Sequence, residues 1–192
     1  MKQKLTILLS FMVLATASFA QNNKAANTKT RFVGMHLNAM DVTTPQVWKD
    51  KSGPKTLAGL REQDLGFSLS FWQTIAPKVD FSAKASVMFH DYSAVDRKSY
   101  SSNYNQVGIE LEPTVNVSAF KATSMYNAFV TTGLGFGSYS KKFGAYVPAG
   151  LGLSANFSNS TRLLVQSQYR FSVTGNTLND NIFYSIGITQ KM

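Results

Sequence analysis

Six charged side chains occupy the polar positions of segments in which apolar and small polar residues alternate: Asp80, Lys84, Glu110, Glu112, Arg162 and Arg170. Single charges that are taken out of water must be paired, because an unpaired buried charge is strongly unfavourable. The sequence therefore predicts that these residues form a structural network of ion pairs inside the fold. We expect no catalytic residue and no cofactor-binding residue among them.

The two histidines are the other candidates for chemistry. His90, Asp91 and Ser93 follow one another at the expected end of a strand, and His36 lies on the polar face of another segment. A nucleophile needs a base within hydrogen-bond reach and a third group that orients the base, and no acylase or deacylase pattern is present. We interpret both histidines as rim or lumen residues. Because the chain has two His and no Cys, we expect no metal site and no disulfide.

The elements that carry these residues are strands, because apolar and polar residues alternate with a period of two. Eight segments show this pattern: 31–40, 65–74, 79–90, 106–117, 126–137, 145–156, 162–173 and 181–189. Each is close to the roughly ten residues that a tilted strand needs to cross a bilayer. An even number of antiparallel strands can close into a barrel without edges. The predicted fold is all-β, an eight-stranded antiparallel up-and-down transmembrane β-barrel.

The connections between these segments differ in length. Short links centre on Pro77-Lys78, Phe120-Lys121 and Ser158-Asn159, whereas the segment 41–63 and the connection between residues 90 and 106 are long. The links 139–144 and 174–180 are expected to be modestly longer than the short turns. Short turns at one end and longer loops at the other are typical of outer-membrane barrels.

A soluble lipocalin-like barrel would show the same alternation with its faces reversed, so the composition of the polar face is informative. That face consists mostly of Gly, Ser, Thr, Asn and Gln, and only 15% of the chain is charged, against about 25% in soluble domains. The apolar face is bulky and carries aromatic residues near strand ends, as an interfacial girdle would: Phe71, Phe81, Phe89, Tyr126, Phe136, Tyr169 and Tyr184. The composition favours an apolar face in contact with lipid, with the lipocalin-like binder as an alternative.

A barrel of eight strands suggests partners for the isolated charges. Folding the third and fourth segments about the loop between them places position 84 opposite position 112, and the seventh segment lies across the ring from the third. We therefore expect three layers of ion pairs, Lys84 with Glu112, Arg170 with Glu110, and Arg162 with Asp80. Because the exact pairing depends on the shear of the barrel, the main expectation is a connected acid–base interior.

The N-terminus predicts export. Lys2 and Lys4 precede the apolar stretch 5–14, and Ser18-Phe19-Ala20 fits a signal-peptidase site. The expected organisation is a cleaved signal peptide (1–20), a polar segment (21–30) and the barrel (31–192). The formal net charge of +9 could indicate a nucleic-acid binder. We expect no nucleic-acid partner, since the chain is exported and no Lys/Arg cluster exceeds two residues.

The sequence resembles the OmpA-type superfamily of small outer-membrane β-barrels over nearly all of the expected mature chain. The resemblance is carried by FVGMHL (32–37), LGFSLSFW (65–72) followed by PKVDFS (77–82), YVPAGLGL (146–153), QYR (168–170) and FYSIGI (183–188). It implies a location in the cell outer membrane. Many relatives carry a periplasmic peptidoglycan-binding domain after the barrel, and no such domain is expected here because the chain stops at Met192.

Function is less determined than fold. Side chains fill the interior of an eight-stranded barrel, and Trp72, Met88, Phe129, Tyr146 and Phe183 would obstruct it, so a general diffusion pore is not expected. We expect a structural, surface-interaction or accessory-subunit role, as a monomer or as a subunit of a membrane complex. The expected partners are outer-membrane lipid, lipopolysaccharide and a possible protein that binds the loop 41–63, which contains Trp48, Pro54 and the stretch 57–60. A lipid-modifying barrel enzyme is the alternative.

Overall fold

The computed structural model describes residues 30–50, 63–90, 106–120, 124–139, 142–158, 160–174 and 178–192. The expected signal peptide (1–20) and nearly all of the segment 21–30 lie outside these ranges, so the domain boundaries stay predictions. Pro54, the stretch 57–60, Asp91 and Ser93 also lie outside the described residues, as does the side chain of His90.

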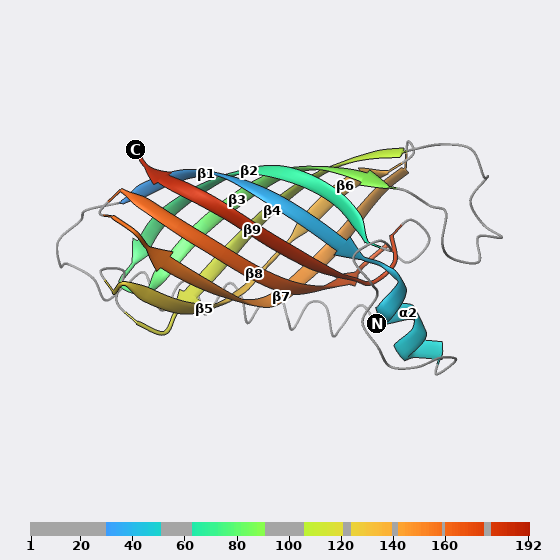
Figure 1. Cartoon of the computed structure of the whole chain (residues 1–192). Coiled ribbons are helices and arrows are strands. Elements are labelled where there is room, and N and C mark those ends of the chain that lie inside the picture. The colour runs from blue at the N-terminus through green and yellow to red at the C-terminus, as the bar shows by residue number, and fades with distance from the viewer. Residues whose placement is uncertain are drawn as a thin grey trace.

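Within these ranges the chain forms long antiparallel strands and one short helix (Figure 1). The elements are β1 (Arg31–Asp41), α2 (Thr43–Asp50), β2 (Asp64–Ala76), β3 (Val79–His90), β4 (Gln106–Ser118), β5 (Tyr126–Gly133), β6 (Gly135–Tyr139), β7 (Lys142–Asn156), β8 (Thr161–Ser172) and β9 (Asn181–Lys191).

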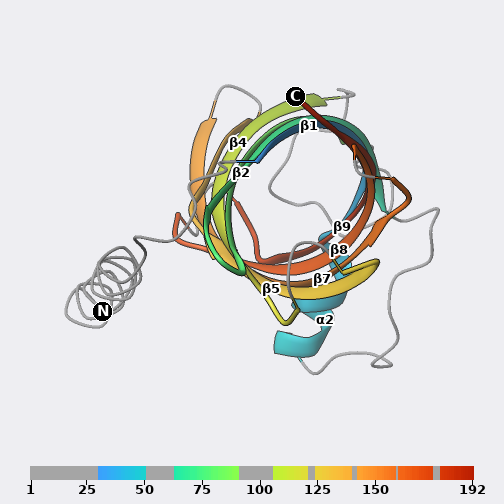
Figure 2. The same ribbon diagram turned by 90° about the vertical axis from the view of Figure 1, so that its left-hand side faces the viewer.

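The strands close into a barrel because each pairs with its neighbours in sequence and β1 also pairs with β9. β5 and β6 follow one another between β4 and β7, so they occupy one strand position of the wall. The wall therefore has eight positions, and Figure 2 shows it as a closed ring around the barrel axis. The prediction of an eight-stranded antiparallel barrel is confirmed.

The break between β5 and β6 has a local cause in two prolines. The register on either side of the break places Pro113 of β4 opposite Leu134 and Pro148 of β7 opposite Gly133. Proline has no N–H to donate to a ladder. Leu134 still donates its N–H to the Pro113 carbonyl, at 3.1 Å. The pairing therefore weakens on both sides at one point, although the register continues unchanged.

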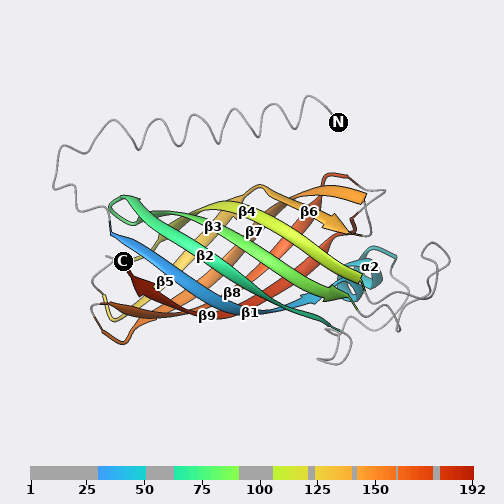
Figure 3. The ribbon, with the colours of Figure 1, turned by 90° about the horizontal axis from the view of Figure 1, so that it is seen from above.

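The two ends of the barrel differ. The connections β2–β3, β4–β5 and β7–β8 lie at one end, the turn end, together with the start of β1 and the end of β9. The opposite end, the loop end, carries α2, the end of β3 and the start of β4 (Figure 3). Two details there differ from expectation. The loop 41–63 contains the helix α2, and β7 begins at Lys142, where it pairs with Tyr139, so the expected link 139–144 is largely a continued hairpin.

The wall has an apolar outside and a polar inside. Along β1, Met35 and Leu37 are 70% and 69% exposed, while the intervening His36 and Asn38 are only 5% and 4% exposed. Apolar clusters lie inside near both ends: Phe32, Trp72, Phe129 and Leu164 near the turn end, and Met40, Met88 and Phe183 near the loop end. The buried charges lie between and beside these clusters. The described residues contain no helix long and apolar enough to cross a membrane.

Candidate functional site

Large side chains fit in the narrow lumen because glycine faces them from the next strand. Phe129 lies opposite Gly152, Tyr146 lies opposite Gly135, and His36 lies opposite Gly187. A Cβ atom added at any of these glycines would overlap the facing ring. The glycines of the polar face therefore provide the space in which the aromatic and polar interior is packed.

Arg170 of β8 is the centre of the interior charge network. Its Nη1 donates to Oε2 of Glu110 at 3.0 Å, and its Nη2 donates to Oε2 of Glu112 at 2.7 Å. The guanidinium carbon lies 3.5 Å from the ring centroid of Phe183 and 4.6 Å from that of Tyr146. Arg170 thus has carboxylates at the edge of its plane and aromatic rings against it, an arrangement that suits a flat, weakly hydrated cation.

Lys84 completes this cluster. It lies opposite Glu112 in the β3–β4 register, and its Nζ donates to Oε1 of Gln166 at 3.0 Å. Gln168 donates to Oε1 of Glu112 at 3.1 Å. Two cations and two carboxylates are therefore gathered in one buried layer, and their formal charges cancel. Such a layer avoids the cost of an uncompensated buried charge.

The remaining two candidates meet near the turn end. Nη1 of Arg162 lies 3.9 Å from Oδ2 of Asp80, and its Nε donates to Oδ1 of Asn156 at 3.0 Å. Thr74 donates to the other oxygen of Asp80 at 2.7 Å. The Arg162 guanidinium also lies over the ring of Phe32, 4.4 Å from its centroid. This pair is looser than the Arg170 cluster and lies at the mouth of the lumen.

His36 lies in the lumen, where its Nε2 is 2.6 Å from Oγ of Ser70. The same hydroxyl accepts a hydrogen bond from the Trp72 indole at 3.1 Å. In the described part of the chain, His36 makes no hydrogen bond to a carboxylate that could orient it as a catalytic base. The described residues also contain no group of three His, Asp or Glu side chains able to hold a metal ion.

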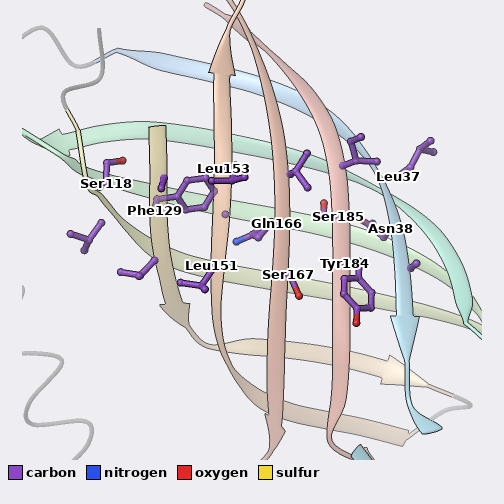
Figure 4. A pocket seen from close by; sticks show the side chains of 18 of the residues that line it. Leu37, Asn38, Ser118, Phe129, Leu151, Leu153, Gln166, Ser167, Tyr184 and Ser185 are labelled. Atoms are coloured by element: carbon purple, nitrogen blue, oxygen red, sulfur yellow. The ribbon is translucent and has the colours of Figure 1, made fainter. Parts of the chain in front are cut away.

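A second feature, the outer groove, lies on the outside of the wall. It has a volume of about 860 Å³ and extends from β4 across β5, β7, β8, β9 and β1 to β2 (Figure 4). Its walls are exposed side chains such as Leu37, Leu151 and Leu153. Gln166 and Ser185 also border the groove, but their side chains are buried, because they occupy lumen-facing positions of the same strands. The groove is therefore a depression in the apolar outer surface, separate from the interior.

At the loop end, Asp180 attaches α2 to the rim. Nζ of Lys49 lies 2.8 Å from Oδ2 of Asp180, which also accepts a hydrogen bond from the Tyr169 hydroxyl at 3.2 Å. The backbone N–H of Ser172 donates to the other carboxylate oxygen at 2.8 Å. Partial burial would raise the pKa of the Asp180 carboxyl, but the Lys49 and Ser172 interactions outweigh it and hold that pKa below its usual range.

The similarity of this protein to known proteins lies in its three-dimensional structure. No protein-family model and no curated protein sequence matches the chain. The structure is similar to the N-terminal β-barrel domain of Pseudomonas aeruginosa OprF, with a TM-score of 0.56, 9% identity and coverage of 86% of this chain and 100% of that one. It is also similar to Neisserial surface protein A (TM-score 0.54, 12% identity, 84% of this chain and 97% of that one). A third similar structure is Ail, the attachment invasion locus protein of Yersinia pestis (TM-score 0.51, 10% identity, 85% and 97%).

The fold is that of the small eight-stranded outer-membrane β-barrels. At these identities the similarity concerns the fold alone, and the site must be judged from its own residues. Several residues that hold the interior network and the rim together could not be recognised from the sequence. Gln166 and Gln168 are two of many neutral polar lumen residues, and nothing in their spacing distinguishes them. The attachment of Lys49 to Asp180 joins residues far apart in the chain, so only the closed barrel brings them together.

Proposed function

We propose that this protein is an integral outer-membrane β-barrel with a structural or surface-interaction role and a lumen closed by its own side chains. The observation that carries this proposal is the reversed polarity of the wall. Met35, Leu37 and Leu151 are 70%, 69% and 66% exposed, whereas Arg170 is fully buried. A soluble protein rarely exposes a continuous apolar surface of this kind, but a lipid-facing barrel requires it.

The interior supports a closed lumen. Aromatic and methionine side chains cluster near both ends, and the neutralised layer around Arg170 lies within the barrel. Eight strands leave an interior only wide enough for side chains. We therefore propose that Asp80, Lys84, Glu110, Glu112, Arg162 and Arg170 stabilise a plug and do not line a conducting pore.

The proposal includes how the protein is exported and how it is oriented in the membrane. Residues 1–20 act as a cleaved signal peptide, 21–30 form a polar segment, and the barrel follows to residue 192. Short turns face the periplasm in barrels of this kind, so the loop end, with α2, faces the exterior. Trp48 of α2 is 42% exposed there. Lipopolysaccharide, or a protein bound by the loop 41–63, is the partner that this surface would meet, whether the barrel acts alone or as a subunit.

The location can be tested by fractionation and electrophoresis. The protein should separate with outer membranes and migrate differently in boiled and unboiled samples, because a closed barrel resists unfolding by detergent. Its mature N-terminus should begin at Gln21. Recovery of the folded protein in the soluble periplasmic fraction would reject the proposal and favour the lipocalin-like alternative.

We also propose that the barrel is not an enzyme. The interaction between His36 and Ser70 resembles part of a hydrolytic site, but it is buried in the lumen, and among the described residues no carboxylate is hydrogen-bonded to the histidine. Substituting His36 and His90 together should leave the acyl chains of lipid A and of phospholipids unchanged in mass spectra. A lost or shifted acyl species would instead support the lipid-modifying alternative.

A further inference from the structure

The outer groove follows a row of residues that are direct partners in the sheet. The row comprises Val117, Val130, Leu151, Ser167, Tyr184, Ala39 and Leu65, each paired with the next across neighbouring strands. All seven line the groove. The row begins one residue from the turn end of β4 and finishes one residue from the loop end of β2. The groove therefore climbs obliquely across the wall from one membrane surface towards the other.

Small residues keep the part of this groove near the turn end open. Ala119 and Ala128 line it near the turn end, and the N–H of Ala119 donates to the Ala128 carbonyl at 2.8 Å. Farther along, Leu151, Leu153 and Ile186 form apolar walls and are all at least half exposed. An apolar channel of this kind, which starts at the membrane surface, has the shape and chemistry to hold a hydrocarbon chain.

A lysine stands where the groove meets the turn end. The Lys78 carbonyl accepts a hydrogen bond from the N–H of Ser118 at 2.7 Å, and its Nζ donates to the Ala119 carbonyl at 3.0 Å. Both partners line the groove. Lys78 has a φ of 69°, a conformation in which glycine or asparagine would be less strained. The ammonium group has three N–H donors, so it can serve the Ala119 carbonyl and still bind an anion.

Charge is distributed unevenly between the two ends. At the turn end, the segments 75–79, 118–126 and 190–192 each contain one lysine and neither Asp nor Glu, and the nearby Asp80 is paired with Arg162 at the mouth of the lumen. The loop end, by contrast, includes Asp41, Asp64 and Asp180. An anionic headgroup would therefore meet attraction at the turn end without acidic neighbours in those segments. This asymmetry assigns a preferred end to a charged lipid.

We propose that the outer groove binds one acyl chain of an anionic glycerophospholipid from the leaflet at the turn end, with the lipid phosphate held by the Lys78 ammonium group. The inference rests on the membrane location proposed above. It goes beyond general solvation by lipid, because it assigns one headgroup charge, one leaflet and one path along the wall.

The test uses the full mature barrel inserted into nanodiscs that contain equal amounts of phosphatidylglycerol and phosphatidylcholine. Native mass spectrometry of the released protein measures which lipid stays bound. The wild type should retain phosphatidylglycerol preferentially. Lys78→Gln should reduce that preference about five-fold, the effect of one surface cation on an anionic lipid, and Lys78→Arg should preserve it. Ala128→Leu, which fills the groove, should reduce retention of both lipids.

Two matched controls separate this site from a general effect. Lys191→Gln removes a cation from the same end, and Ala85→Leu enlarges an exposed residue of β3 that does not line the groove. Both should behave like the wild type. Equal losses in Lys78→Gln and Lys191→Gln, or equal retention of the two lipids by the wild type, would overturn the inference. Failure of the wild type to insert, or loss of its heat-modifiable migration, would count against the proposed function instead.

Discussion

Two arginines of the same strand, β8, have opposite surroundings. Arg170, near the loop end, is completely buried and contacts two carboxylates at 3.0 and 2.7 Å between aromatic rings. Arg162, near the turn end, keeps about 10% of its side chain exposed, and its carboxylate partner Asp80 is 3.9 Å away. Both point into the same lumen, but only the first is sealed on every side.

The difference shows how the barrel handles charge at different depths. A fully buried guanidinium needs close carboxylates, and the surplus negative charge of Glu110 and Glu112 is balanced by Lys84. At the mouth, water can share the solvation of Arg162, so a longer contact and a neutral amide from Asn156 suffice. Arg170 and Arg162 are the same residue type on one strand, but they should therefore differ strongly in their contribution to the stability of the barrel.

The largest effect is expected when the Arg170 cluster loses its negative charge. Glu110→Gln with Glu112→Gln leaves Arg170 and Lys84 buried without compensation, which should lower the free energy of unfolding by about 3–5 kcal/mol. Urea titration in detergent or lipid measures the shift of the midpoint. Neutral substitutions of lysines 51 or 98, which lie between strands in the sequence, serve as controls and should have little effect. An unchanged midpoint in the double variant would mean that the polar face is not a sealed lumen.

A smaller loss is expected from overpacking beside the cluster. Gly135→Ala forces a methyl group against the Tyr146 ring that packs on Arg170, and such overpacking costs about 1–3 kcal/mol. The same titration measures it. In a Tyr146→Ala background the added methyl group has no ring to displace, so the cost of Gly135→Ala should largely disappear. A cost that is equal in both backgrounds would show that Tyr146 is not the cause.

The Arg162 pair should contribute less. Asp80→Asn removes a long contact at a partly exposed site, so we expect a loss of about 1 kcal/mol or less. Because water and ions reach the mouth of the lumen, the loss should shrink as salt is added, whereas the effect of the double Glu variant should not. A loss for Asp80→Asn as large as that of the double variant would remove the proposed distinction between the two arginines.

The smallest effect concerns the attachment of α2. The pKa of Asp180 is lower in the folded protein than in the unfolded chain, so the attachment contributes its full stability above the usual carboxyl range. That contribution should be lost as the pH falls through the lowered pKa. Trp48 fluorescence in a Trp72→Phe background follows α2 during acid titration. Asp180→Asn should abolish the transition, and an identical transition in that variant would assign it to another group.

The sequence by itself determined the wall and its two faces. A strand places alternate side chains on opposite faces, so the period of two in segments such as 79–90 identifies strand, lumen face and outer face together. The short turn at Pro77-Lys78 then fixes the register of its hairpin, and Lys84 lies opposite Glu112 across the next connection. The strands, their two faces and the hairpin registers depend only on the local pattern and on segments adjacent in the chain, so they can be predicted from the sequence.

Only the tertiary structure decided what meets across the lumen and outside it. The sequence suggested Arg170 as a partner of Glu110, but the shear of the closed ring places Arg170 against Glu112 as well, which local spacing does not specify. It also aligns the row from Val117 to Leu65 into the outer groove and places Asp180 beside Lys49. These contacts join strands that are distant in the chain. Their geometry arises from closure of the whole barrel, because a change in stagger moves every cross-lumen partner while leaving each strand's alternation intact.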